Sequence, residues 1–373
     1  MDDNEKLVLS KSDKRFFYNR SSSNNQKQLQ NVIMNHYGCD ECYITCSGMK
    51  SISMLLHGLC QQIQSQSDNT AINIICSDEL YCDTPNTLVY ITNTYKNTYF
   101  NFVDIENPDE IREILLNYSK SEEIKKIMLK CPNVVNILFL ESCSNPHGKV
   151  FDFSLIQEFR SLTKQLYVVV DNTWLTEVIF NPFLVDVDFV VMSLTKYYSA
   201  GNAIGGAILS KSANKNVIEK IILFGRLNGE HVSPHNCEII EKNMLTIKSR
   251  ILTSSEITID LISQLLKLKH KIVNSIIHPY CSDKVIVKQF FNDNIYPSVL
   301  VIRLNVRSKN KLMKTLNHFD KIDFKTSFGY KHTRIDSFPF KNDNDTISIR
   351  LSVGYEDTGG NIFNNLCILF DLL

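Results

Sequence analysis

The segment "LYVVVDNTWLTEVIFNPFLVDVDFVVMSLTKYYSAG", residues 166–201, holds two apolar runs that each end in polar residues. The first run ends at Asp171, and the second leads into Ser193, Thr195 and Lys196. Continuous runs of Val, Leu and Phe indicate strands that are buried on both faces, as in parallel sheets covered by helices. The separation of Asp171 and Lys196 corresponds to about one strand–helix–strand unit, so the segment predicts neighbouring strands of an α/β sheet.

The flanking sequence extends this pattern in both directions. Further strand-like runs, "AINIICS", "NVVNILFLES" and "GGAILS", alternate with helix-sized segments such as "DFSLIQEFRSLTKQ". We therefore predict a mostly parallel sheet sandwiched by helices over residues 41–245. Residues 1–40 are polar and are expected to form an arm. Residues 246–373 combine long amphipathic stretches with strand candidates and are expected to form a smaller α+β domain.

Composition narrows the class of partner. The chain has 373 residues, 43% of them hydrophobic, and its 40 basic and 40 acidic residues balance. Balanced charge gives no general attraction to nucleic acid or to an anionic membrane, so a small molecule is the expected partner. The start, "MDDNEKLVLSKSDKRFF", lacks the apolar stretch of a signal peptide, and no apolar run is long enough to span a bilayer, which favours a cytoplasmic protein.

The eleven cysteines favour free thiols over a disulfide framework, because no secretory signal accompanies them. Cys39 and Cys42 in "CDEC" have a spacing that occurs in zinc sites, with Cys46 nearby. No second pair follows at the spacing that a zinc finger needs, so no metal site is predicted.

Ligands of parallel α/β sheets bind at the carboxyl ends of the strands, so the residues after each apolar run are candidates for a site. Gly48 and Met49 begin a helical pattern whose free N–H groups suit an anion, although a Ser-Gly pair before a helix is also an ordinary cap. Tyr81 follows "AINIICS", where an aromatic ring belongs either to the core or to a cofactor platform. Asn145 lies in "ESCSNPHG", which is either a purely structural turn or part of the site.

Asp171 and Lys196 indicate which kind of ligand the site binds. A carboxylate directly after a buried strand needs a cationic or proton-sharing partner, although an Asp there also caps helices. Lys196 is either a solvated side chain or a nucleophile. Pyridoxal 5'-phosphate requires three groups: an acid beside its ring nitrogen, an anion site for its phosphate and a lysine amine for its aldehyde. Asp171, the anion site with the hydroxyls of Ser193 and Thr195, and Lys196 match these three in that order. The sequence thus predicts that cofactor.

Seven motifs follow one another along nearly the whole chain: "YNRSSSNNQKQLQ", "SGMKSIS", "ESCSNPHGKVFD", "LYVVVDNTW", "SLTKYYSAG", "NGEHVSPHNCEIIEKNMLTIKSR" and "ISIRLSVGYED". In this order they resemble the pyridoxal-phosphate-dependent Cys/Met metabolism enzymes, the transsulfuration family of cystathionine γ-synthase, cystathionine lyases and methionine γ-lyase. The resemblance implies the type I aminotransferase-like fold, with a pyridoxal phosphate domain and a smaller C-terminal domain. It also implies a homodimer or homotetramer with shared active sites.

The resemblance assigns roles in the cofactor site. Lys196 matches the lysine that forms the Schiff base, and Asp171 matches the partner of the pyridinium nitrogen. Tyr81 matches the tyrosine stacked on the ring, and Asn145 matches an asparagine near the ring hydroxyl. Ser193, Thr195 and the amides of Gly48 and Met49 match groups that contact the phosphate. Tyr18 and Arg20 match residues that reach the phosphate of a neighbouring subunit.

The resemblance also implies a substrate and a reaction. Arg350 matches the arginine that binds the α-carboxylate through two N–H groups, and Ser327 lies at the edge of that pocket. Lys196 is expected to remove the α-proton as a general base, with Tyr81 assisting near the leaving group. The implied reaction is β- or γ-elimination or replacement at a C–S or C–O bond of a cystathionine, homocysteine, methionine, cysteine or O-acylhomoserine type substrate. The alternatives are a non-sulfur γ-substitution or decarboxylation with the same cofactor, or a non-catalytic descendant.

Several stretches depart from the family pattern. The loop "KYYSAGNAIGG" is one residue shorter and lacks the histidine that commonly follows the lysine. "LYCDT" has Cys82 and Asp83 in place of two glycines, and Phe328 in "SFGY" replaces an aliphatic residue. The stretch "KHTRID" that follows does not match, and because this region tends to distinguish β from γ chemistry, the reaction subtype stays open.

Overall fold

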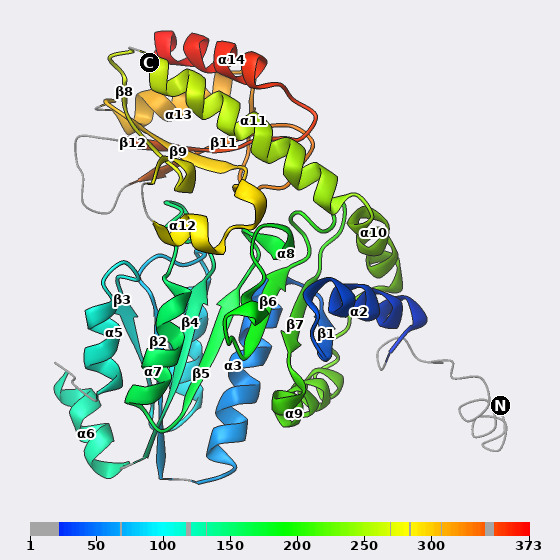
Figure 1. The fold of residues 1–373 in the computed structure, drawn as a ribbon, viewed down its shortest axis with the longest axis vertical. Helices are drawn as coiled ribbons and strands as arrows, with labels where there is room; N and C mark the ends of the chain where they lie inside the picture. Colours follow the sequence, from blue (N-terminus) through cyan, green and yellow to red (C-terminus); the bar gives the residue numbers. More distant parts are fainter. Residues whose placement is uncertain are drawn as a thin grey trace.

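The computed structural model describes residues 22–67, 69–116, 121–131, 133–268, 270–282, 285–306, 308–339 and 347–373. These residues form two β-sheets, each with helices packed against it, and Figure 1 shows the smaller sheet at one end of the larger one. The strands of the larger sheet lie between residues 41 and 210, and those of the smaller sheet after residue 270.

Seven strands form the larger sheet in the order β1-β7-β6-β5-β4-β2-β3. They are β1 (Glu41–Thr45), β2 (Thr70–Ser77), β3 (Thr98–Val103), β4 (Asn133–Glu141), β5 (Leu166–Asp171), β6 (Phe189–Ser193) and β7 (Gly206–Ser210). Strand β7 pairs antiparallel with β1 and β6, and the other pairs are parallel. The mostly parallel sheet predicted from the apolar runs is therefore confirmed.

The strand β5 shows why these runs become central strands. Val168 and Val170 belong to the apolar core on one face of the sheet, and Val169 belongs to the core on the other. All three side chains are fully buried. Because successive side chains of a strand point to opposite faces, a run without polar residues is stable only where helices cover both faces.

Helices cover both faces of the larger sheet. One core contains residues of α3 (Gly48–Gln64), α4 (Thr84–Thr94) and α9 (Lys215–Leu227). The opposite core contains residues of α2 (Asn24–Tyr37), α5 (Pro108–Leu115), α7 (Ile156–Leu162), α8 (Thr176–Ile179) and α10 (Pro234–Met244). Helix α6 (Glu122–Lys130) packs against a small separate cluster that includes Ala71 and Tyr99.

The smaller sheet has the order β10-β11-β12-β9-β8. Its strands are β8 (Val273–Ile277), β9 (Val299–Leu304), β10 (Asp323–Phe324), β11 (Arg334–Pro339) and β12 (Ile347–Ser352). Its apolar core is completed by α11 (Ile247–Lys267), α13 (Lys309–His318) and α14 (Gly359–Leu372). The short helices α12 (Val285–Phe290), η1 (Phe153–Leu155), η2 (Pro182–Leu184), η3 (Ser212–Asn214), η4 (Pro279–Cys281) and η5 (Asn292–Asn294) complete the assignment.

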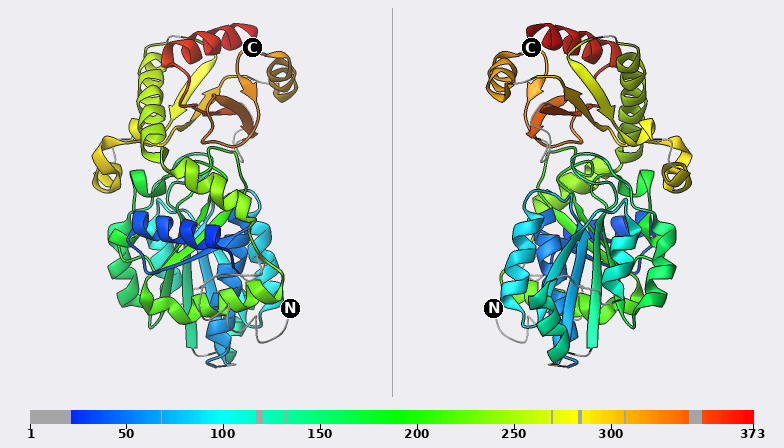
Figure 2. Two further views of the ribbon diagram at one scale, coloured as in Figure 1. Left: turned by 90° about the vertical axis from the view of Figure 1, so that its right-hand side faces the viewer. Right: turned by 90° about the vertical axis from the view of Figure 1, so that its left-hand side faces the viewer.

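The loops that follow β4 and β6 contact the part of the chain that carries the smaller sheet, and Figure 2 shows the smaller sheet above the larger one from two further sides. Lys196, three residues after β6, donates a hydrogen bond to Ser327, and Asn145, four residues after β4, accepts one from Arg350 of β12. Residues at the strand ends of the larger sheet are therefore in direct contact with the smaller sheet and its loops.

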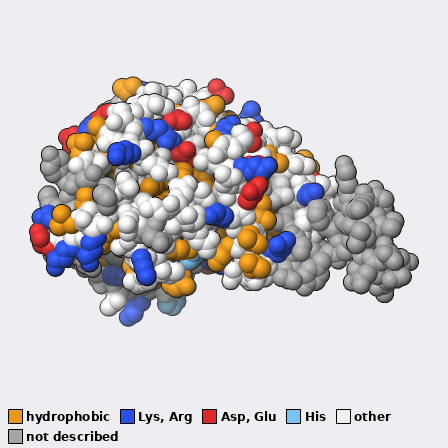
Figure 3. All heavy atoms as spheres, turned by 90° about the horizontal axis from the view of Figure 1, so that it is seen from below, with side chains coloured by type: hydrophobic (Ala, Val, Ile, Leu, Met, Phe, Trp, Pro, Cys, Tyr) orange, Lys and Arg blue, Asp and Glu red, His pale blue; other side chains and the backbone are white. Residues whose placement is uncertain are grey.

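Two general features of the described residues bear on partners. None of the described helices is both long and apolar enough to cross a membrane. On the face seen in Figure 3, basic and acidic side chains both occur, with hydrophobic side chains between them.

Candidate active site

The site begins where three neighbouring strands end. Glu141 is the last residue of β4, Asp171 of β5 and Ser193 of β6, and Glu141 lies directly opposite Asp171 in the strand pairing. The parallel direction of β4, β5 and β6 brings these three side chains and the loops that follow them to one edge of the sheet.

Asp171 is held by the turn that follows it. The backbone N–H of Thr173 donates to Asp171 Oδ1 at 2.9 Å, and the Thr173 hydroxyl donates to the same oxygen. Within the described ranges, hydrogen bonds to this carboxylate reach only Oδ1, so Oδ2 is available to a ligand. Burial raises the pKa of Asp171, while the Thr173 hydrogen bonds and the charge of Lys196 act in the opposite direction.

The start of helix α3 forms a tight cradle beside Ser193. Ser47 caps the helix by accepting a hydrogen bond from the Lys50 N–H at 3.2 Å. A Cβ on Gly48 would lie 2.6 Å from Ser193 Cβ, so only glycine allows the helix to approach the end of β6 this closely. The amides of Gly48 and Met49 lie in the first turn, where N–H groups have no partner within the helix and suit an anion.

The hydroxyls of Ser193 and Thr195 have different surroundings. The Ser193 oxygen lies 3.1 Å from the position that a Cβ on Gly48 would take, so it faces the start of α3. The Thr195 hydroxyl donates to the Gly205 carbonyl at 3.3 Å and accepts from the Gly205 N–H at 3.2 Å. Thr195 therefore fastens the lysine loop to the chain before β7, and its role as a phosphate ligand stays a prediction.

Lys196 lies partly buried against the smaller domain. Its amine donates to the Ser327 hydroxyl at 2.8 Å and lies 5.3 Å from the centre of the Phe328 ring. Burial, with the charges of Arg350 and Arg334, lowers the pKa of Lys196 to about 8. An ordinary lysine titrates near 10.4, so a much larger share of this side chain is the neutral, nucleophilic amine near neutral pH.

Arg350 is a buried cation with an oriented guanidinium. Its side chain is only 4% exposed, and Nη1 donates to Asn145 Oδ1 at 2.9 Å while Nη2 donates to Thr326 Oγ1 at 3.2 Å. Asp336, opposite it on β11, lies 3.7 Å away. The guanidinium is therefore held by Asn145 from the larger sheet's side and by Thr326 from the smaller sheet's side. A guanidinium fixed in this way can bind a carboxylate through two parallel N–H groups.

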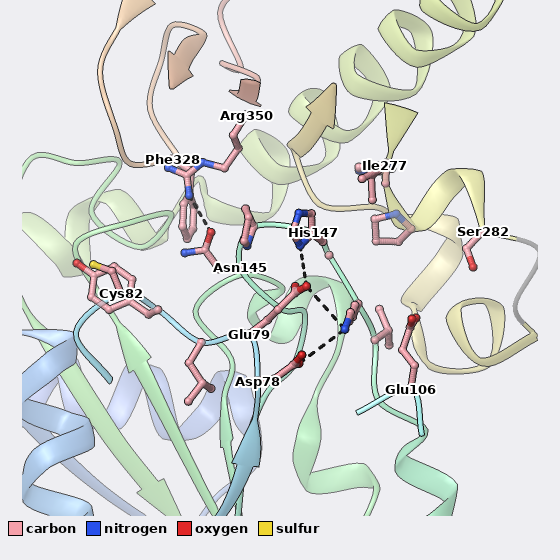
Figure 4. A pocket seen from close by; sticks show the side chains of 18 of the residues that line it. Asp78, Glu79, Cys82, Glu106, Asn145, His147, Ile277, Ser282, Phe328 and Arg350 are labelled. Atoms are coloured by element: carbon pink, nitrogen blue, oxygen red, sulfur yellow. Dashed lines mark hydrogen bonds and ion pairs between the residues drawn. The ribbon is translucent and has the colours of Figure 1, made fainter. Parts of the chain in front are cut away.

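A cavity of about 1200 Å³ connects several of these groups. The predicted site residues in its lining are Tyr81, Asn145, Lys196, Ser327 and Arg350. The predicted residues that lie outside this lining are Gly48, Met49, Asp171, Ser193 and Thr195. Figure 4 shows Arg350 reaching down to Asn145, with Cys82 across the cavity on the chain that follows β2.

Two predicted residues, Tyr18 and Arg20, lie outside the described residues. Cys39 and Cys42, weighed as a possible metal pair, belong to the apolar core, where burial raises the pKa of the Cys39 thiol to about 12 and that of Cys42 well above its ordinary value. The described part of the chain holds no group of three or more His, Cys, Asp or Glu side chains placed to bind a metal.

Sequence reasoning missed Glu141. Its carboxyl is 6% exposed and accepts a hydrogen bond from the Tyr81 N–H, so it fixes the backbone of the predicted ring-stacking residue. Burial, followed by the charge of Asp171, raises the pKa of Glu141 well above its ordinary value. The signal was present, because Glu141 follows an apolar run just as Asp171 does.

The outer part of the cavity was also missed. His147 Nδ1 lies 2.6 Å from Glu79 Oε1, and Lys149 Nζ lies 3.0 Å from Asp104 Oδ1. Figure 4 shows Glu79 and His147 of this group close to Asn145, with a dashed line between them. His147 and Lys149 sit in the turn that contains Asn145, and only the fold brings Glu79 and Asp104 to them.

The residues present fit pyridoxal phosphate. The free carboxylate oxygen of Asp171 suits a protonated ring nitrogen, and the α3 cradle, which a Cβ on Gly48 would fill, suits a phosphate group. Lys196 supplies an amine with a lowered pKa. The three groups named from the sequence are thus present at one edge of one sheet.

Solved structures show the same fold. A methionine gamma lyase from Micromonospora echinospora superposes with a TM-score of 0.77 at 17% identity, covering 95% of this chain and 89% of that one. A cystathionine gamma synthase from Xanthomonas oryzae pv. oryzae gives 0.79 at 17% identity, covering 96% and 88%. The described fold is therefore that of the type I pyridoxal phosphate enzymes, as predicted.

The family model for "Cys/Met metabolism PLP-dependent enzyme" matches residues 1–361, so the chain belongs to this family. Its cofactor, pyridoxal phosphate, is the one predicted from the sequence. A cystathionine beta-lyase of Neurospora crassa is 24% identical over 63% of this chain and 46% of its own length. An L-methionine gamma-lyase of Fusobacterium nucleatum subsp. polymorphum is 28% identical over 38% of this chain and 35% of its own length. The matched stretch spans less than two thirds of either relative.

Proposed function

We propose that the chain is an enzyme that uses pyridoxal phosphate to eliminate or replace a β- or γ-substituent of a sulfur-containing amino acid or an O-acylhomoserine. The observation that carries this proposal is the Lys196 amine, which lies in the cavity and has a pKa lowered to about 8. An amine that titrates near the working pH serves both as a nucleophile and as a base. The relatives, which include cystathionine lyases, methionine gamma-lyases and an O-succinylhomoserine sulfhydrylase, support the substrate class.

The residues at the strand ends hold the cofactor. When bound, pyridoxal phosphate supplies an electron sink for the negative charge that develops at the substrate α-carbon. Asp171 Oδ2 holds a proton at the ring nitrogen. The first N–H groups of α3 and the Ser193 hydroxyl would bind the phosphate, and Tyr81 would contact the cofactor ring.

The residues of the cavity act on the substrate. Arg350 binds the α-carboxylate through a guanidinium that Asn145 and Thr326 already orient. Lys196 Nζ takes the α-proton and keeps it within reach of the β- and γ-carbons. Burial raises the pKa of Tyr81, so its hydroxyl enters the reaction protonated and donates toward the leaving group.

The assembly and location of the protein belong to the same proposal. We propose a homodimer or homotetramer in which Tyr18 and Arg20 of one subunit reach the phosphate of its neighbour, in the cytoplasm. We also propose that residues 1–40 act as the arm, residues 41–245 as the cofactor domain and residues 246–373 as the small domain. The two separate sheets support this division.

Substrate assays of the cofactor-loaded protein test the function. Cystathionine, methionine, cysteine and O-acetylhomoserine are supplied in turn, the last with a thiol, and ketoacid, thiol and thioether products are measured. We expect turnover of at least one substrate and its loss in Lys196→Ala. A protein that binds the cofactor but forms none of these products from any of them would instead support a non-sulfur reaction.

A further inference from the structure

Two of the stretches that depart from the family pattern touch each other. Gly201, in the shortened loop after Lys196, has a left-handed φ of 78°, and a Cβ there would lie 2.0 Å from Tyr330 Cε1. Tyr330 immediately follows the "SFG" segment and precedes "KHTRID". The Tyr330 ring therefore lies directly on the loop backbone, and only glycine at position 201 leaves room for it.

Arg334 completes this contact from strand β11. Its Cζ atom lies 3.3 Å from the centre of the Tyr330 ring, the arrangement of a guanidinium stacked on an aromatic face. The same guanidinium donates through Nη1 to the Thr326 carbonyl at 3.3 Å. Arg334 thus links the ring to the residue that precedes Ser327.

The segment between these anchors lies on the lysine loop. Ser327 accepts the hydrogen bond from the Lys196 amine, and the Phe328 ring packs 5.4 Å from that of Tyr197. A Cβ on Gly329 would lie 2.8 Å from the Tyr197 nitrogen. Ser327 itself has a left-handed φ of 87°, a conformation that non-glycine residues keep only where their surroundings impose it.

We propose that Tyr330 and Arg334 are positioning residues for Lys196: the ring anchored on Gly201 and the arginine stacked on it hold Ser327 and Phe328 against the lysine amine. The inference rests on the proposed role of Lys196 as the cofactor lysine. It also gives a physical reason for the small residue in the loop after Lys196, because the tyrosine ring packed there leaves room only for glycine at position 201.

Charge gives Arg334 a second effect. The titratable groups that act on Lys196 are Arg350, Arg334, Asp171 and Cys82, and both arginines lower the pKa of the amine. Removal of one nearby cation changes the pKa of a partly buried amine by about 0.5 unit. The stack therefore fixes the amine in space and also helps to keep it neutral.

Trace labelling of the cofactor-free protein with acetic anhydride tests this inference. The reaction is run at a series of pH values, and the peptide that contains Lys196 is quantified by mass spectrometry to give the titration midpoint of its amine. We expect a midpoint near pH 8 in the wild type, raised by about 0.5 unit in Arg334→Leu and also raised in Tyr330→Ala.

Two further variants sharpen the test. Tyr330→Phe keeps the ring and is expected to restore the wild-type midpoint. Lys331→Met removes a cation from the same segment, but Lys331 is 59% exposed and outside the stack, so the midpoint is expected to stay unchanged. If Tyr330→Ala does not fold, the midpoint of Lys196 is measured in Arg334→Leu instead, because Arg334 is only half-buried and its loss is expected to be tolerated.

Unchanged midpoints in folded Tyr330→Ala and Arg334→Leu would overturn the inference, as would an equal shift in Lys331→Met. The readout needs neither cofactor nor substrate, so it stays separate from the proposed function. A wild-type protein that never binds pyridoxal phosphate would contradict that function but would leave the labelling result interpretable. A protein that binds the cofactor without any dependence on Tyr330 or Arg334 would contradict the positioning role alone.

Discussion

At the scale of single residues, Lys196 carries most of the proposed chemistry. Its pKa is lowered from the ordinary value because the amine is buried, and because Arg350 and Arg334 disfavour its charged form. The neutral amine is the nucleophile, so the rate at which the protein captures pyridoxal phosphate should rise with pH up to about 8 and then level off. Stopped-flow absorbance across the pH range checks this. A rate that keeps rising to the titration range of an ordinary lysine would contradict the lowered pKa.

Glu141 and Asp171 form a second residue-scale feature, because their carboxyls lie on adjacent strand ends. A buried acid with a raised pKa keeps a proton that the unfolded chain loses above about pH 4.3. The free energy of unfolding therefore falls as pH rises from that value through the pKa of the folded state. Glu141→Gln removes this titration, so its urea midpoint should fall less than that of the wild type between pH 5 and 7.

The control for this comparison is Glu122→Gln, because Glu122 is 77% exposed and pairs with Lys125 at the surface. Its pH dependence should follow the wild type. Parallel urea curves for Glu141→Gln and the wild type at both pH values would show that Glu141 is not a buried protonated acid.

Much of the residue-scale site could be predicted, because Asp171, Ser193 and Lys196 all follow apolar runs in the sequence. The partners of these residues could not. Ser327, Phe328 and Arg334 reach the lysine from a different sheet, and nothing local in "KHTRID" indicates that an arginine there stacks on Tyr330. Such contacts depend on how two separate elements dock.

At the scale of elements, the packing of α3 against the end of β6 decides the phosphate site. Gly48→Ala would place a Cβ 2.6 Å from Ser193 Cβ and 3.0 Å from its Cα, so the helix must move away from the strand. We expect a loss of about 1–3 kcal/mol in stability and at least about a tenfold weaker affinity for pyridoxal phosphate. Thermal unfolding and a cofactor titration measure the two effects.

Gly360→Ala is the matched control, since Gly360 lies in the first turn of α14 and a Cβ there meets nothing within 4 Å. It should leave cofactor affinity unchanged and stabilise the protein by up to about 1 kcal/mol. Equal affinities in Gly48→Ala and Gly360→Ala would remove the argument for a phosphate cradle at α3.

The strands of the larger sheet were largely predictable, because apolar runs without alternation require cover on both faces. The reversal of β7 was not, since "GGAILS" reads the same in either direction of pairing. Its direction follows from the short connection after Lys196, which turns the chain back beside β6. Residues 194–205 form turns and lack the helix that usually links parallel neighbours.

At the scale of the whole molecule, the site belongs to two sheets at once and, in our proposal, to two subunits. Asn145 and Arg350 join the sheets within one chain, while Arg20 is proposed to come from a neighbour. Arg20→Gln and Lys196→Ala should each be inactive. A random mixture of the two should recover about a quarter of the wild-type activity, because half of the dimers are hybrids with one intact site.

Analytical ultracentrifugation, and subunit exchange followed by native mass spectrometry, establish that the hybrids form. Hybrids without any recovered activity would contradict the shared site. The division of the chain into two sheets was predictable from the change in sequence pattern. The contact between them was not, because it consists of hydrogen bonds and ring contacts between residues far apart in the chain.

The most direct test of the central claim is to find where the cofactor attaches. The purified protein is incubated with pyridoxal phosphate, reduced with borohydride and digested, and the peptide that carries the adduct is identified by mass spectrometry. We expect one stoichiometric adduct on Lys196, and none in Lys196→Ala. An adduct on another lysine, or no adduct at all in the folded wild-type protein, would contradict it.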